Sequence, residues 1–219
     1  QSRKKNGIVS WDLYTLLFAR ATDEHIALGE VSPNYMLNYL TSAKQIQQRL
    51  PNAKLIAVLR DPVERACSNY LMNMRDATGK QTSLAEQVRS RGSSSYVLLK
   101  GKYYESLKYF FEVCGRHRVD VFFYDDLRQN SQRFMQSLYQ SIGVNPNFDV
   151  NTSQKAQTAK VPKNQALNRL LKTQNPVRSV ATGIMQIVPK ELRHQLRERL
   201  ITLNSQDKQK AKFTEEDII

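Results

Sequence analysis

The sequence predicts an α/β fold in which helices flank both faces of a central parallel sheet. Two short apolar runs, residues 55–59 and 118–124, each lie between segments with helical periodicity. The first run is too short for a stable lone helix and too continuous for a half-exposed strand, so it predicts a buried parallel strand. With 219 residues, 40% of them hydrophobic, we expect one domain spanning residues 1–219.

The composition argues against several classes of protein. No apolar run approaches the ~18 residues needed to cross a bilayer, and the start, QSRKKNG, lacks the apolar core of a signal peptide. Two cysteines are too few for a disulfide framework, and the three histidines lie far apart in the sequence. We therefore expect neither a redox pair nor a metal site.

The net charge of +13 is concentrated in residues 151–212, which attract polyanions unless their lysines and arginines simply form a solvated face. No nucleic-acid-binding motif is present, and the charge is not interleaved with aromatic residues. The sequence therefore argues against nucleic acid as the main partner. A non-catalytic basic module that binds a nucleotide or an anionic glycan stays open as an alternative to an enzyme.

The stretch after the first predicted strand has the pattern of a tight turn followed by a helix. Asp61 is expected to cap that helix and Pro62 to occupy its first position. Arg60 lies at the carboxyl end of the strand, and Ser68 lies two turns into the helix. Ligand anions collect at such strand-to-helix junctions, so both side chains can face one, although Arg60 could instead pair with a surface carboxylate.

Upstream, residues 12–19 predict a helix that begins at Ser10 or Asp12. Residues 25–30 predict a short apolar strand that ends at Glu30, beside a turn where a carboxylate is placed for chemistry. The alternative is that Glu30 is a helix cap or an ion-pair partner. Residues 42–50 predict a further helix.

Downstream, helices are predicted over residues 82–89, with Ser83 and Glu86 as a capping box, and over 101–111 and 131–142. Asp125 and Asp126 are expected to cap a helix and charge its first turn. Residues 91–95 form a Gly/Ser-rich loop.

The C-terminal third is predicted to begin with a basic loop containing Lys155, Lys160 and Lys163. A helix follows with Leu167, Leu170 and Leu171 on its apolar face, and Pro189 opens a last helix that runs to Leu203.

Several of these segments resemble sulfotransferases that use 3′-phosphoadenosine 5′-phosphosulfate (PAPS), over about residues 14–203. Arg60-Asp61-Pro62, followed by Arg65 and by Ser68-x-Tyr70, is similar to their 3′-phosphate motif, which implies that Arg60 and Ser68 hold that phosphate. GEVSPNY resembles the Glu-x-Ser/Thr-Pro-x-Tyr segment of the heparan-type and bacterial members, which implies that Glu30 deprotonates the acceptor. GKYYESL and Pro162-Lys163 also look like the family, and Lys160 and Lys163 are the implied further PAPS contacts.

The resemblance implies a P-loop-like three-layer fold and transfer of a sulfuryl group from PAPS to a hydroxyl or amine, on a carbohydrate or small molecule, without a metal. The product would be adenosine 3′,5′-bisphosphate. No Gly-x-x-x-x-Gly-Lys is present, so we expect the family's N-terminal strand, phosphosulfate loop and helix to be missing. Another P-loop-related nucleotide transferase is the alternative enzyme. Short loops and scarce cysteine favour a bacterial cytoplasmic protein, with a Golgi-lumen relative as the alternative.

Overall fold

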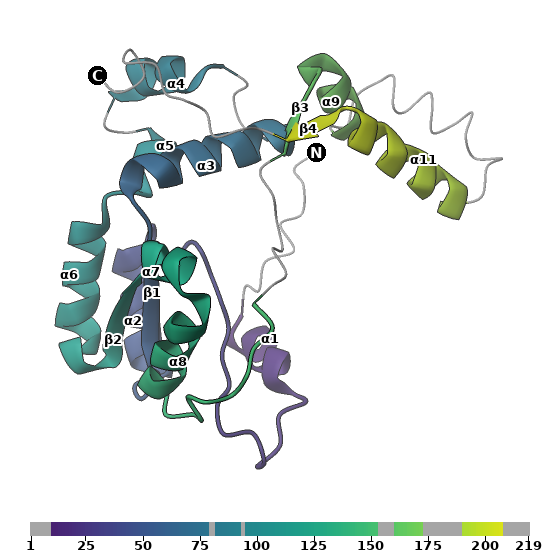
Figure 1. Cartoon of the computed structure of the whole chain (residues 1–219). Coiled ribbons are helices and arrows are strands. Elements are labelled where there is room, and N and C mark those ends of the chain that lie inside the picture. The colour runs from purple at the N-terminus through teal and green to yellow at the C-terminus, as the bar shows by residue number, and fades with distance from the viewer. Residues whose placement is uncertain (1–9, 79–81, 93–94, 153–159, 173–189, 208–219) are drawn as a thin grey trace.

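The computed structural model describes residues 10–78, 82–92, 95–152, 160–172 and 190–207. Strands β1 (Leu55–Leu59) and β2 (Val119–Phe123) pair in parallel, with Leu55 opposite Val119 and Leu59 opposite Phe123. The predicted parallel sheet is confirmed in a mixed α/β arrangement of the P-loop-like kind. Both strands end at the same edge, so the residues that follow them are neighbours (Figure 1).

Helices cover both faces of this sheet, as expected for three layers. On one face α2 (Tyr39–Arg49) and α6 (Tyr103–Cys114) bury a cluster of Ala43, Phe110, Cys114 and Val119. On the other face α8 (Ser131–Ser141) packs the ring of Phe134 against Phe122, with ring centroids 5.5 Å apart. Val119 and Phe122 lie on opposite faces because side chains alternate along a strand.

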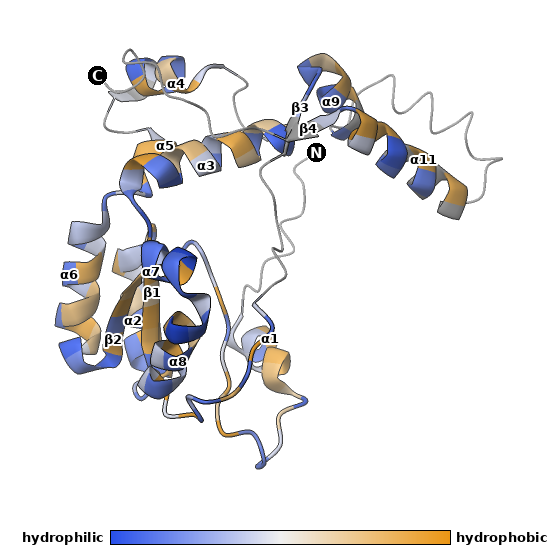
Figure 2. Cartoon of the chain, in the orientation of Figure 1, coloured by the Kyte–Doolittle hydropathy of each residue, from blue (hydrophilic) through white to orange (hydrophobic). Residues whose placement is uncertain are grey.

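The same face is less well covered over β1, whose run of apolar residues is visible in Figure 2. Leu59 is buried, but Ile56 and Val58 keep 38% and 46% of their surface exposed. The prediction of a strand buried on both faces is therefore wrong for the described residues. The reason is that α8 lies against β2 through Phe122 and leaves the corresponding part of β1 open.

A buried arginine connects α2 to the start of β2. Arg118 is only 7% exposed and donates to the carbonyl oxygens of Ala53 and Leu50 at 3.0 and 2.9 Å. Its Nη1 also donates to Oε1 of Gln47 at 2.6 Å. Because its guanidinium finds several acceptors, the charge is tolerated in the interior.

Helix α3 (Pro62–Arg75) begins as the sequence predicted. Pro62 is its first residue, and the carboxylate of Asp61 accepts a hydrogen bond from the backbone N–H of Glu64 at 2.9 Å. The helix buries Ala66, Cys67 and Met74, the apolar stripe that its periodicity indicated. Its N-terminus therefore starts directly above the carboxyl end of β1.

The other helices largely follow the predicted segments, with shifted ends. Helix α1 (Trp11–Thr15) is capped by Ser10 and continues as the 3-10 turn η1 (Leu16–Phe18). Ser83 caps α4 (Leu84–Arg91) through the N–H of Glu86. The remaining short elements are α5 (Tyr96–Leu99), η3 (Arg116–Arg118) and α7 (Tyr124–Gln129). Among the described residues, none of the helices is long and apolar enough to span a membrane.

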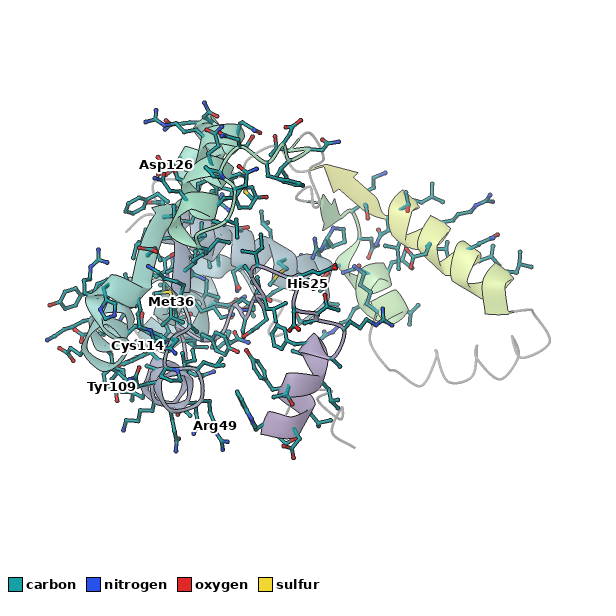
Figure 3. All side chains as sticks on the ribbon, turned by 90° about the horizontal axis from the view of Figure 1, so that it is seen from below. His25, Met36, Arg49, Tyr109, Cys114 and Asp126 are labelled. Carbon is teal, nitrogen blue, oxygen red and sulfur yellow. The ribbon has the colours of Figure 1, made fainter. Side chains whose placement is uncertain are left out.

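The strand predicted over residues 25–30 is absent. This segment is irregular, and Ile26 and Leu28 keep 84% and 54% of their surface exposed. Figure 3 shows His25 well away from Arg49 on α2 and from Tyr109 and Cys114 on α6. Among the described strands it has no pairing partner, and an unpaired strand leaves its backbone groups unsatisfied. Apolar composition alone therefore gave the wrong local structure here.

The C-terminal elements gather at the far end of α3 (Figure 1). Strand β3 (Lys160–Pro162) pairs antiparallel with β4 (Ser205–Asp207), flanked by α9 (Gln165–Lys172) and α11 (Lys190–Leu203). The amide of Asn168, which is 5% exposed, donates to the carbonyls of Met74 and Arg75, both at 3.1 Å. Helix α9 is thereby attached to the C-terminal end of α3.

Candidate anion and acceptor sites

Arg60 lies where the sequence placed it, directly after β1 and before the N-cap of α3. Its carbonyl oxygen accepts a hydrogen bond from the hydroxyl of Tyr103, at the start of α6, at 3.0 Å. Burial is the main cause of the raised pKa of Tyr103, so this phenol stays protonated and able to donate. The backbone at the strand end is therefore fixed by a side chain from a neighbouring helix.

The guanidinium of Arg60 is held on two sides. Its Nε and Nη2 donate to the same carboxylate oxygen of Glu64, at 3.1 and 2.8 Å. Its Cζ lies 4.9 Å from the centre of the Tyr124 ring, a cation–π distance. Tyr124 follows β2 as Arg60 follows β1, which explains the contact. Nη1 has no hydrogen-bond partner among the described residues, so the outer edge of the guanidinium remains open to an anion.

Glu64 and Ser68 share one face of α3 because residues four apart lie one above the other on a helix. The carboxylate of Glu64 also lies 3.4 Å from Nη1 of Arg128, on α7. Ser68 is exposed, so its hydroxyl is accessible one turn further along. The pairing of Arg60 with a carboxylate was the predicted alternative to anion binding, and the structure shows that it occurs. It does not exclude an anion, because the open edge of Arg60 is not used by Glu64.

Arg65, the second arginine of the 3′-phosphate motif, is directed elsewhere. Its Nη2 donates to the carbonyl of Val97 in α5, and burial lowers its pKa. It therefore ties α3 to α5, whereas Arg60 stays at the strand end.

Glu30 lies in the irregular segment before α2, not at a strand tip. Its carboxylate accepts a hydrogen bond from the hydroxyl of Tyr35, whose ring packs against the core cluster. Burial, followed by this hydrogen bond and the negative charge of Glu30, raises the pKa of Tyr35; burial and Glu30 likewise raise the pKa of Tyr14. The protonated phenol of Tyr35 thus donates a hydrogen bond to an exposed carboxylate.

In the described structure, Glu30 is not joined directly to the group formed by Arg60, Glu64 and Arg128. Among the described side chains, no hydrogen bond or ion pair connects Glu30 to any of these three residues. Their participation in one reaction stays a prediction.

Strand β3, which Lys160 begins and Lys163 follows, lies at the C-terminal end of α3, whereas Arg60 precedes the N-terminal end of that helix (Figure 1). Lys160 begins β3, so its placement in a loop was wrong, because Pro162 and its neighbours pair with β4. Lys163 follows the strand, is exposed, and is anchored through its backbone N–H to the carbonyl of Asn204 at 2.7 Å. Lys155 lies outside the described residues. Contact of Lys160 or Lys163 with a nucleotide stays a prediction.

Asp125 and Asp126 lie in the first turn of α7, as predicted, although Phe123 occupies the cap position. Asp125 lies 3.5 Å from Arg128 in an ion pair. Within the described ranges, no three His, Cys, Asp or Glu side chains form a group that could hold a metal ion.

Sequence reasoning missed Glu64, Tyr124 and Arg128. The i, i+4 spacing of Glu64 after Arg60 could have indicated the ion pair. The position of Tyr124 directly after the second strand could have placed it beside Arg60, once the two strands were taken as neighbours. No local signal connects Arg128 to α3, since 64 residues separate it from Glu64.

Comparisons with known proteins agree with this description. The sulfotransferase family model matches residues 10–149, which include Glu30, Arg60 and Ser68 but neither Lys160 nor Lys163. Among solved structures, the chain is similar to a sulfotransferase from Alicyclobacillus acidocaldarius, with 26% identity and a TM-score of 0.61. The match covers 68% of this chain and spans 63% of that protein. A search of curated proteins gave no match.

The family match covers more than half of the chain and includes both the strand-to-helix junction and the segment around Glu30. The structural match agrees with it in fold. The chain belongs to the sulfotransferase family.

Proposed function

We propose that this protein transfers a sulfuryl group from PAPS to a hydroxyl or amine acceptor, on a carbohydrate or small molecule. The observation that carries the proposal is the position of Arg60, at the carboxyl end of β1 with one edge of its guanidinium open. Family membership and the exposed Ser68 on the adjoining helix face support it.

In this proposal the 3′-phosphate of the donor binds between Arg60 and Ser68. Arg60 supplies charge-assisted hydrogen bonds, which are about twice as strong as neutral ones, and Ser68 supplies a hydroxyl donor. Lys160 and Lys163 are proposed as further contacts that add positive charge. Adenosine 3′,5′-bisphosphate is the expected product.

Sulfuryl transfer resembles phosphoryl transfer, in which catalysis depends mainly on positioning and on stabilising charge. The acceptor must also lose a proton, and Glu30 is the proposed base. Its carboxylate is exposed and therefore reachable by an acceptor, while the Tyr35 hydroxyl orients it. General-base assistance of this kind is worth roughly 10²- to 10⁴-fold in rate.

The test is single-turnover sulfate transfer from PAPS to a panel of hydroxyl and amine acceptors, normalised to folded protein. Glu30→Gln keeps the size of the side chain but removes its basicity, so transfer should slow by about two orders of magnitude or more while PAPS binding persists. Glu24→Gln, an exposed residue in the same segment, is the matched control and should leave the rate unchanged.

An unchanged rate in Glu30→Gln would remove Glu30 from the mechanism and leave it as a hydrogen-bond partner of Tyr35. If the wild-type protein binds PAPS but sulfates none of the acceptors, the non-catalytic binding module becomes the better description.

A further inference from the structure

The contacts around Glu64 suggest a role beyond pairing two charges on the surface. One oxygen of its carboxylate accepts from both Nε and Nη2 of Arg60, and the same oxygen lies 3.4 Å from Nη1 of Arg128. Glu64 thus connects the end of β1 with α7, two elements that are far apart in the sequence.

The edge of Arg60 that Glu64 uses determines which edge remains. A guanidinium has five N–H donors in a fixed planar fork. With the Nε side taken by Glu64 and one face of the plane against Tyr124, the donors that remain are those at the outer end of the guanidinium. The orientation of Arg60 is therefore set before any ligand arrives.

A carboxylate so close to an anion site would normally repel the anion. Arg128 reduces this effect, since it places a second positive charge against the same oxygen of Glu64. Arg128 is itself held by Asp125 at 3.5 Å. With Asp125 counted, the four linked side chains carry no net charge, so the anion is favoured by the outer N–H donors of Arg60 itself, while Arg128 offsets the nearby carboxylate of Glu64.

We propose that Glu64 is a positioning residue, which presents the open edge of Arg60 to the 3′-phosphate of the nucleotide, and that Arg128 holds Glu64 in place. This inference rests on the proposed function, because it deepens the description of the same phosphate site. Neither residue is assigned a contact with the nucleotide. The gain comes from preorganisation: an arginine that is already fixed loses less side-chain entropy on binding.

The test is the Kd of adenosine 3′,5′-bisphosphate and of adenosine 5′-monophosphate, measured by calorimetry on the whole chain. Glu64→Ala should raise the Kd of the bisphosphate about 3- to 10-fold and leave that of the monophosphate unchanged. Glu64→Gln keeps an acceptor oxygen and should fall between wild type and Glu64→Ala. Asp76→Ala, at the other end of α3, makes the same change in net charge and should have no effect.

The two nucleotides separate positioning from a general loss of structure, because a misfolded variant would lose affinity for both.

Arg128→Ala should weaken bisphosphate binding by a smaller factor in the wild-type background and have no additional effect in Glu64→Ala. An additional effect there would overturn the assignment of Arg128, since it would then act on the ligand directly.

The proposal is overturned if Glu64→Ala binds the bisphosphate as tightly as wild type or more tightly, because Glu64 would then be a competitor of the phosphate. An equal loss in Asp76→Ala would also overturn it, as the effect would follow net charge. Arg60→Ala separates the proposed phosphate site from the proposed role of Glu64. If both Arg60→Ala and Glu64→Ala leave the Kd unchanged, the assignment of the phosphate site is wrong. If Arg60→Ala weakens binding and Glu64→Ala does not, only the role of Glu64 is wrong.

Discussion

Replacing Arg60 by alanine should weaken the binding of adenosine 3′,5′-bisphosphate more than any other single substitution in the described part of the site. The change removes the guanidinium whose outer edge is open, together with its hydrogen bonds to Glu64 and its contact with Tyr124. It leaves the negative charge of Glu64 beside the site, where Arg128 lies 3.4 Å from its carboxylate.

The magnitude follows from the kind of contact that is lost. A hydrogen bond to a charged group contributes roughly 1.5 to 3 kcal/mol, which corresponds to about 10- to 150-fold in Kd. The side chain of Arg60 is 30% exposed, so solvent screens part of this interaction. We therefore expect the lower part of the range, about 10- to 40-fold.

Calorimetric titration of wild type and variant with the bisphosphate measures this change, at one stated salt concentration because phosphate binding depends on ionic strength. Arg49→Ala is the matched control. Arg49 also carries a guanidinium over an aromatic ring, 5.4 Å from the centre of Trp11, and its loss changes the net charge equally. Its Kd should equal that of wild type.

Equal affinity of Arg60→Ala and wild type would refute the assignment of the strand end as the phosphate site. So would equal affinity of the wild-type protein for adenosine 3′,5′-bisphosphate and adenosine 5′-monophosphate, since the 3′-phosphate would then contribute nothing.

Two further predictions concern stability and protonation. Arg118→Met keeps an apolar stem but leaves the carbonyls of Ala53 and Leu50 without their donor, so the free energy of unfolding should fall by about 2 to 4 kcal/mol. Thermal unfolding measures this change, and Lys54→Met, at a half-exposed lysine, is the control. A fall of less than about 1 kcal/mol in Arg118→Met would contradict the prediction. The pKa of the Tyr35 phenol is raised in the folded protein, so this phenol stabilises the fold at pH values below the unfolded pKa of about 10, and the stabilisation is lost as the pH rises through the folded pKa. Tyr35→Phe should remove this contribution to the free energy of unfolding. In an ultraviolet titration, loss of one tyrosine's absorbance change near a pH of about 10 in Tyr35→Phe would show that Tyr35 ionises like an exposed tyrosine and would contradict this prediction.

The sequence alone determined the features that depend on neighbours in the chain. The apolar run 55–59, Asp61 and Pro62 specify a strand, a cap and the start of α3, and the structure confirms all three. These features are local because each depends on backbone geometry and hydrogen bonds within a few residues. The position of Arg60 at the end of β1 followed directly from them.

Tertiary structure decided which side chains meet at that position. Tyr124 lies beside Arg60 only because β2 pairs in parallel and in register with β1, and Arg128 reaches Glu64 only because α7 follows β2. The segment 25–30 shows the converse, since its apolar residues suggested a strand that has no partner strand in the described structure. A strand is stable only when another strand satisfies its backbone groups, and its own sequence does not contain that information.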